Sequence, residues 1–117
     1  MTFDLFVGIG WSGARGELHR GISVFAAERG DVPPRPVSPP GGAKRWSRPA
    51  VMDYLQHASE TKQVLAGIDF AFAHPFHDTG SYYPNATGSP DNPRGLWQLI
   101  DEINQQQPYL YGGAIWD

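Results

Sequence analysis

Residues 64–73 read Val-Leu-Ala-Gly-Ile-Asp-Phe-Ala-Phe-Ala, an apolar run whose single charge is Asp69. Short apolar runs rich in β-branched and aromatic residues predict a strand that is covered on both faces. A carboxylate in such a strand ionises against a desolvation penalty unless hydrogen bonds or a metal compensate it. Asp69 is therefore a candidate functional residue. The alternative is that Asp69 lies at the wet end of the strand and caps the following turn.

Length and composition favour a single α/β domain spanning residues 1–117. Hydrophobic residues make up 40% of the chain and aromatic residues 13%, which is enough for a globular core. The absence of cysteine excludes disulfides and thiolate metal sites. A net charge of −3 does not favour a broad nucleic-acid surface, although it is compatible with a local basic patch. No signal peptide or membrane span is visible, which predicts a cytoplasmic protein with no membrane partner.

The hydrophobic pattern predicts the element order β-β-(β)-α-β-α, which is an α/β or α+β layer arrangement that begins with an antiparallel hairpin. Residues 3–11 and 17–27 are β-prone and are separated by a glycine-rich turn over residues 12–16, which indicates an antiparallel hairpin. The proline-rich residues 30–42 allow at most a short edge strand involving Val32 or Val37.

Capping residues and spacing predict two helices. The first begins after Ser47, with Pro49 in its first turn and apolar residues at positions 51, 55 and 58, with Met52 beside them. The second begins after Asp91 or Asn92 and carries apolar residues at positions 96, 100 and 103. Residues 74–93 between them are too many for an ordinary connection, and indicate an active-site loop or a mobile segment.

Residues 8–13, Gly-Ile-Gly-Trp-Ser-Gly, match the spelling of the G-x-G-x-x-G dinucleotide motif. In that motif the third glycine opens a helix whose N-terminus holds the pyrophosphate. Here residues 17–27 are β-prone, so no crossover helix fits, and a parallel return needs one. We therefore do not expect a dinucleotide cofactor.

Three stretches together resemble a known family: residues 7–14 (Val-Gly-Ile-Gly-Trp-Ser-Gly-Ala), residues 45–48 (Arg-Trp-Ser-Arg) and residues 66–75 (Ala-Gly-Ile-Asp-Phe-Ala-Phe-Ala-His-Pro). They are similar to motifs of an uncharacterised bacterial family of predicted nucleases with the ribonuclease-H-like fold. Residues 112–116 (Gly-Gly-Ala-Ile-Trp) are similar to a glycine-aromatic loop that follows the second helix in the same family. The resemblance implies a ribonuclease-H-like mixed sheet that covers only the first half of such a protein, without its final strand and helix.

The resemblance implies a divalent-metal-dependent nuclease with Asp69 as the catalytic, metal-binding carboxylate. The first and fourth strands would run parallel and adjacent, so that carboxylates at their ends hold Mg²⁺ or Mn²⁺ ions about 4 Å apart. Where the family has aspartate in the first strand, this chain has Gly10. Asp4 is not a substitute, because six residues of strand place it about 20 Å away. The alternative is a non-catalytic binding or interaction domain on the same fold.

Two histidines and an acid near Asp69 extend this hypothesis. His74, His77 and Asp78 follow the strand closely and could form a metal or proton-transfer cluster, with His74 and Asp78 as the candidate metal ligands, although such spacing is common in loops. His19 and His57 are interpreted as packing or surface residues.

Two further segments are candidates for contact with nucleic acid. Ser12 and Gly13 lie in a glycine turn that is typical of phosphate binding, or is a plain hairpin turn. Arg45, Trp46 and Arg48 form a basic cluster around an aromatic residue, which predicts contacts to a phosphate backbone and to bases. The alternative for this cluster is that Trp46 packs under the loop and the charges are solvated. The sequence does not indicate an oligomeric state.

Overall fold

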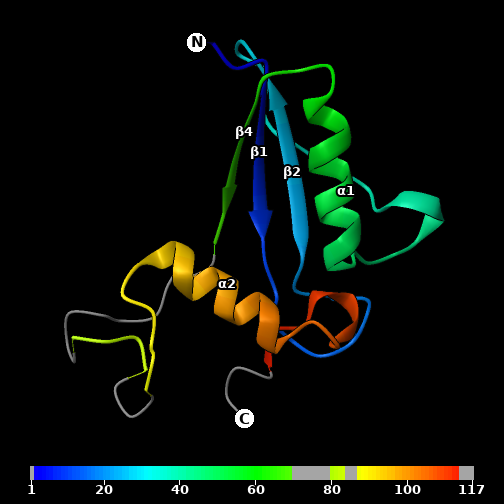
Figure 1. Ribbon diagram of the computed structural model, residues 1–117. Coiled ribbons are helices and arrows are strands. Elements are labelled where there is room, and N and C mark those ends of the chain that lie inside the picture. Colours follow the sequence, from blue (N-terminus) through cyan, green and yellow to red (C-terminus); the bar gives the residue numbers. More distant parts are fainter. Residues whose placement is uncertain (1, 70–79, 84–86, 114–117) are drawn as a thin grey trace.

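The computed structural model describes residues 2–69, 80–83 and 87–113. Its strands and helices are β1 (Leu5–Gly10), β2 (Ser23–Glu28), β3 (Arg35–Pro36), α1 (Arg48–Ser59), β4 (Val64–Ile68) and α2 (Pro93–Ile103), with short 3-10 turns at Pro40–Gly42 and Pro108–Leu110. Figure 1 shows the sheet with α1 along one side of it. The predicted element order and the α/β class are confirmed.

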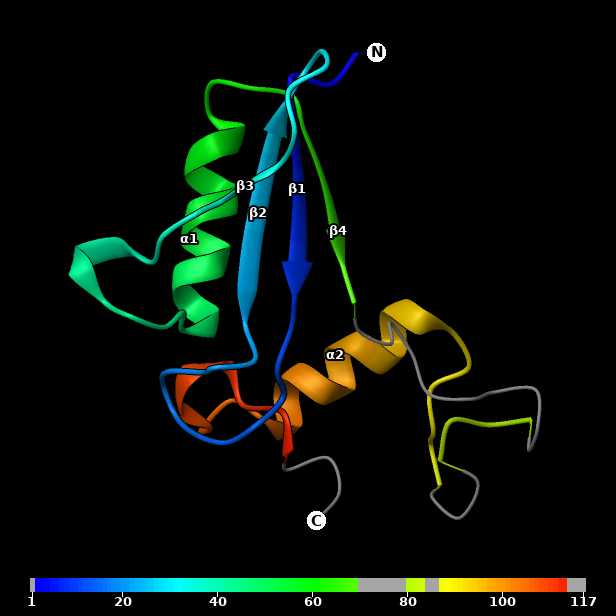
Figure 2. The ribbon, with the colours of Figure 1, turned by 180° about the vertical axis from the view of Figure 1, so that it is seen from behind.

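The sheet is mixed, with the strand order β3-β2-β1-β4. β1 pairs antiparallel with β2 and parallel with β4, while β2 pairs antiparallel with the short β3. Figure 2 shows β4 and β3 on opposite sides of the β1–β2 pair. The predicted hairpin and the predicted parallel pairing of the first and fourth strands are both confirmed. Because β2 follows β1 antiparallel and without a helix between them, residues 8–13 do not form the strand–turn–helix unit of the dinucleotide motif.

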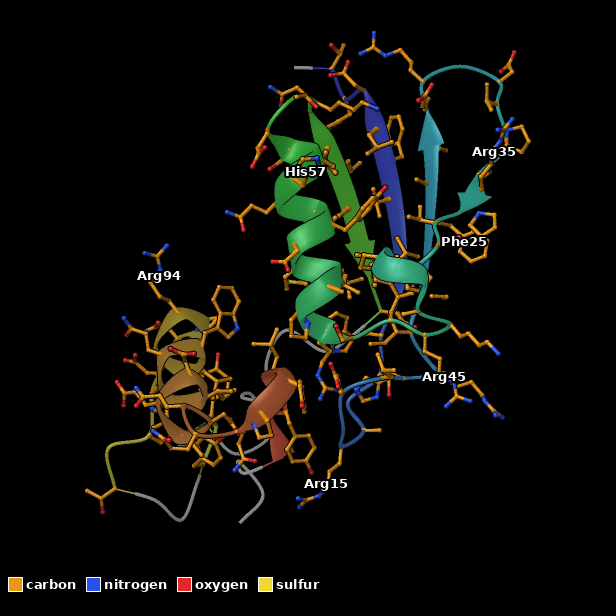
Figure 3. The ribbon with its side chains drawn as sticks, turned by 90° about the vertical axis from the view of Figure 1, so that its right-hand side faces the viewer. Arg15, Phe25, Arg35, Arg45, His57 and Arg94 are labelled. Atoms are coloured by element: carbon orange, nitrogen blue, oxygen red, sulfur yellow. The ribbon has the colours of Figure 1, made fainter. Side chains whose placement is uncertain are left out.

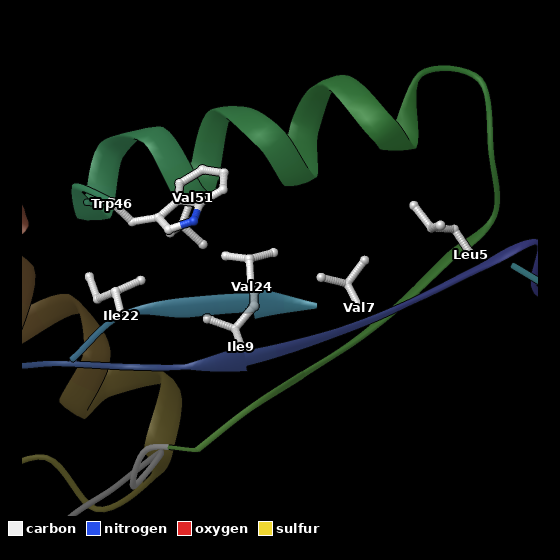
Figure 4. Close-up of a cluster of buried hydrophobic side chains, with 7 residues drawn as sticks. All are labelled: Leu5, Val7, Ile9, Ile22, Val24, Trp46 and Val51. Atoms are coloured by element: carbon white, nitrogen blue, oxygen red, sulfur yellow. The ribbon is translucent and has the colours of Figure 1, made fainter. Parts of the chain in front are cut away.

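The core lies between α1 and one face of the sheet. Alternate residues of β1 and β2 point to this face, as the two-residue period of a strand requires. The buried cluster consists of Leu5, Val7, Ile9, Ile22, Val24, Trp46 and Val51 (Figure 4). The domain therefore has two layers in this part, one helix on one sheet face.

Helix α1 forms as its sequence predicts. The Ser47 hydroxyl accepts a hydrogen bond from Ala50 N at 3.1 Å and caps the helix. Val51 is fully buried, and Leu55 packs against the core. Met52 is exposed instead, and Tyr54 packs edge-to-face on Trp46 with ring centroids 6.0 Å apart.

The prediction that the Asp69 strand is covered on both faces is wrong for its described part. β4 is an edge strand of the described sheet, and Leu65 is 48% exposed. Val64 and Ile68 pack against the core, so among the described residues a layer covers one side of β4 only. An apolar run shows that a strand is hydrophobic, but it does not show how many layers cover the sheet.

The connection between β1 and β2 is longer than predicted. β2 begins at Ser23, because His19 pairs with Trp46 rather than with β1. His19 N donates to Trp46 O at 2.9 Å, and His19 Nε2 lies 2.9 Å from Gly16 O. His19 is buried, in agreement with its interpretation as a packing residue, whereas His57 is exposed beside Glu60.

Helix α2 begins as predicted at Pro93, and its cap is Asn92. The Asn92 side chain accepts from Gly95 N at 2.8 Å, and Leu96 is fully buried. α2 lies beyond the ends of β1 and β4 that carry Gly10 and Ile68 (Figures 1 and 2). Neither α1 nor α2, the helices that the structure describes, has the length and apolarity needed to cross a membrane.

We predict that Tyr54 makes the stability of the fold sensitive to alkaline pH. Burial raises the pKa of the Tyr54 hydroxyl above its ordinary value. The stability linked to Tyr54 is therefore fully present below about pH 10 and is lost as the pH rises through the pKa of the folded state. In urea unfolding between about pH 8 and pH 11, we expect Tyr54→Phe to lose less stability than the parent. Parallel curves for the two proteins contradict this prediction.

Candidate functional site

Asp69 directly follows β4 and is exposed. Its backbone N donates to Ile9 O at 3.3 Å, which continues the parallel pairing one residue past the strand. Its Oδ1 accepts from Trp11 N at 2.7 Å. Asp69 is therefore a solvent-exposed carboxylate at a strand end, as the alternative interpretation expected. It caps the end of the neighbouring strand β1, however, and not the turn that follows its own strand.

Gly10 lies beside Asp69 at the end of β1. It pairs with Ser23 of β2, so Ser23, Gly10 and Asp69 form one row across the sheet, on the face away from α1. A Cβ at Gly10 would lie 2.7 Å from Ser23 Oγ. Position 10, where the resemblance expects a second carboxylate, therefore has no side chain. The Ser23 hydroxyl occupies part of the volume that such a side chain would need.

Ser23 is a residue of this row that sequence reasoning missed. The antiparallel register of β1 and β2 places it beside Gly10. That register depends on the long connection of residues 11–22, which the sequence pattern did not predict.

Asp4 lies at the other end of β1, as expected. Its Oδ1 is 3.2 Å from Arg29 Nη2, and its Oδ2 accepts from Gln63 N at 3.0 Å. Asp4 therefore joins the start of β1 to the segment before β4 and takes no part in the Asp69 row.

Arg48, the first residue of α1, is almost fully buried. Its Nη1 donates to Ser12 O at 2.8 Å and to Ala14 O at 2.9 Å, and its Nε donates to Tyr109 O at 2.8 Å. Desolvation lowers the pKa of the Arg48 guanidinium, and the nearby Tyr111 partly offsets this effect. The contacts join the start of α1, the loop after β1 and the turn at Pro108–Leu110.

The predicted nucleic-acid cluster does not form a surface. Trp46 is buried with its Nε1 donating to Val37 O at 3.2 Å, so its ring is not available for stacking on a base. Arg48 is buried against backbone carbonyls and is not available to a phosphate. Of the three residues in this cluster, Arg45 alone is exposed. Trp46 thus packs under the loop, as the alternative interpretation expected. Arg48 was expected either to contact nucleic acid or to be solvated, and it is buried instead.

The Ser12–Gly13 turn is held by local and buried contacts. The Ser12 hydroxyl accepts from Ala14 N at 3.3 Å, and the Ser12 carbonyl accepts from Arg48. No helix begins in this loop, so it lacks the helix N-terminus that strengthens many phosphate sites.

His74 and Asp78, the remaining predicted metal ligands, lie outside the described residues. Within residues 2–69, 80–83 and 87–113, no three His, Cys, Asp or Glu side chains lie together in a way that would hold a metal ion. In the part of the chain that is described, Asp69 is the single carboxylate of its row.

Comparison with known proteins leaves the family open. The chain has no significant match among protein-family models, curated proteins or solved structures. The structure defines the class as an α/β domain with a mixed four-stranded sheet in the order 3-2-1-4 and two helices.

We predict that Arg48 holds the loop after β1 and the Pro108–Leu110 turn in place. Hydrogen bonds to a charged group contribute about 1.5–3 kcal/mol each, but burial of the charge offsets part of that. We therefore expect Arg48→Met to lower the free energy of unfolding by about 2–4 kcal/mol.

The measurement is urea unfolding, with Arg45→Met as the matched control. Arg45 is exposed and precedes the same helix, so its substitution should change stability by less than about 0.5 kcal/mol. Equal stability of Arg48→Met and Arg45→Met would show that the three contacts contribute nothing net.

Proposed function

We propose that this chain is a non-catalytic binding domain built on a ribonuclease-H-like framework. The observation that carries the proposal is Gly10 beside Asp69, at the adjacent ends of two parallel strands. Two-metal phosphodiester hydrolysis needs several carboxylates around a pair of cations. The described row Ser23–Gly10–Asp69 offers one carboxylate, so these residues do not fit a pair of Mg²⁺ or Mn²⁺ ions.

The hydrogen bond to Asp69 also supports the proposal. Its Oδ1 accepts a backbone N–H from Trp11 at 2.7 Å, which is a short, charge-assisted contact. A carboxylate used in this way joins β4 to the segment after β1. The mixed strand order and the parallel β1–β4 pair agree with the ribonuclease-H-like framework that the sequence resembles.

The second candidate function is the divalent-metal-dependent nuclease. It is favoured by the exposure of Asp69 at the C-terminal end of its strand, where an ion and a phosphodiester have access. In this candidate His74 and Asp78, which lie outside the described residues, would be the further ligands, and Mg²⁺ or Mn²⁺ would supply Lewis-acid activation of water and of the leaving oxygen.

A restored carboxylate tests the proposal directly. Gly10→Asp needs Ser23→Ala beside it, because Ser23 Oγ lies 2.7 Å from the new Cβ. We expect calorimetry to detect no Mn²⁺ binding to the parent and a new site in the Gly10→Asp, Ser23→Ala double variant. The matched control is Gly10→Asn with Ser23→Ala, which keeps the shape without the charge. Tight Mn²⁺ binding by the parent argues against the non-catalytic proposal.

A cleavage assay separates the two candidate functions. We expect no cleavage of a panel of DNA and RNA substrates above background with either Mg²⁺ or Mn²⁺. If the nuclease candidate is correct, the parent cleaves and Asp69→Asn lowers the rate by about a hundredfold or more. Asp101→Asn, an exposed acid on α2, is the control for loss of charge alone.

A further inference from the structure

The sheet face opposite α1 is uncovered in the described part of the chain and carries large apolar side chains. Phe6 is 39% exposed and Phe25 is 45% exposed, on the neighbouring antiparallel strands β1 and β2. Phe25 pairs with Gly8, and Phe6 is two residues before Gly8, so the two rings are diagonal neighbours on this face. Leu65 of β4 lies beside Phe6 in the parallel register.

Two glycines form the floor of this face. Gly8 of β1 pairs with Gly67 of β4, and a Cβ added at either position would meet no atom within 4 Å. A hollow of about 470 Å³ results. Its lining residues are Phe6, Val7, Gly8, Phe25, Ala27, Pro34, Leu65, Ala66 and Gly67, none of which is charged. A flat apolar group has room to lie on the glycine floor against an aromatic ring.

A second hollow, of about 400 Å³, adjoins the first at Phe25 and is polar where the first is apolar. It also touches Ile22, Val24 and Trp46 of the core, so it lies beside β2 rather than on the face itself. Three of its lining residues, Arg20, Lys44 and Arg45, are cations, and no acidic residue lines it. All three are exposed, and within the described residues none forms an ion pair with a carboxylate. Figure 3 shows the Phe25 ring projecting outward from β2 and the Arg45 side chain extending on the same side of the view. In a chain of net charge −3, this grouping of unpaired cations favours an anionic ligand.

We propose that this sheet face binds single-stranded nucleic acid. The inference deepens, and rests on, the proposed binding function by naming its ligand. A base stacks on Phe25 over the Gly8–Gly67 floor, and Arg20, Lys44 and Arg45 bind the phosphates of the strand where it continues into the second hollow. Aromatic side chains beside a cationic groove are the usual means of binding single strands without sequence readout. A duplex keeps its bases stacked inside, so it cannot offer one to Phe25.

A second copy of the chain is a poorer occupant of this face. Each copy carries Arg20, Lys44 and Arg45 in the hollow that adjoins Phe25, and Asp69 is the one acid in the three described rows of this face, so face-to-face pairing offers these cations few acids to pair with. Like charges without acids between them oppose association.

The test is fluorescence anisotropy with a labelled single strand of about 12 nucleotides, as DNA and as RNA, and with the corresponding duplex. EDTA is present throughout, so no cleavage takes place. We expect the parent to bind the single strands and to bind the duplex at least about 10-fold more weakly. We expect Phe25→Ala to weaken single-strand binding by about 10-fold, with Phe25→Leu close to it because leucine keeps the apolar contact but not the stacking. Met52→Ala, an exposed apolar residue on α1, is the matched control and should bind like the parent.

Salt dependence tests the cationic hollow separately. The logarithm of affinity for a single strand falls with the logarithm of salt concentration by about 0.7 per phosphate contact. The triple variant Arg20→Gln, Lys44→Gln, Arg45→Gln should therefore lower that slope by about 2 between about 50 and 200 mM salt. Arg94→Gln, a cation on α2, should leave the slope unchanged.

Several results overturn the inference. The inference is wrong if the folded parent binds neither single strand, or if Phe25→Ala binds single strands as tightly as the parent does. It is also wrong if the parent binds the duplex as tightly as the single strands. Sedimentation that shows a dimer in the parent and a monomer in Phe25→Ala would assign the face to a second copy. Metal-dependent cleavage, in contrast, counts against the non-catalytic function and leaves binding at Phe25 in place.

Discussion

The hydrogen bonds on both edges of β1 are the constraint on which the rest of the structure depends. β1 pairs antiparallel with β2 and parallel with β4. A parallel return requires a crossover, so residues 48–59 form α1 and cover one face of the sheet. The same pairing brings Gly10 and Asp69 together and leaves the other face, with Phe6 and Phe25, uncovered in the described part of the chain.

The difference between the two candidate functions comes down to one side chain on this frame. Neighbouring strands lie about 4.8 Å apart, so carboxylates at positions 10 and 69 would be close enough to share a cation. Gly10 removes one of them, and Ser23 Oγ lies 2.7 Å from the place that a Cβ at position 10 would take. The backbone is the same in either case, which is why the function has to be argued from the residues of the row and not from the fold.

Local signals in the sequence predicted local structure well, and long-range contacts account for what was missed. The caps at Ser47 and Asn92 depend on residues three positions away, so the starts of α1 and α2 are readable in the chain. The pairing of His19 with Trp46 and the burial of Arg48 depend on segments more than 25 residues apart. A basic residue also looks solvated in a sequence, because nothing local shows that Ser12, Ala14 and Tyr109 will each turn a carbonyl toward it.

Trp46 keeps an indirect part in the proposed binding face. Its indole donates to Val37 O, and Val37 N in turn donates to Val24 O of β2 at 2.8 Å. The segment before α1 is thereby fastened to the β3 side of the sheet, and Lys44 and Arg45 directly precede Trp46 at the cationic hollow. In the proposed binding face, the aromatic residue of the sequence cluster would thus position the cations, and the base would stack on Phe25, which the sequence pattern placed in an ordinary strand. A motif read along the chain joined two roles that the proposed binding face divides between a loop and a strand.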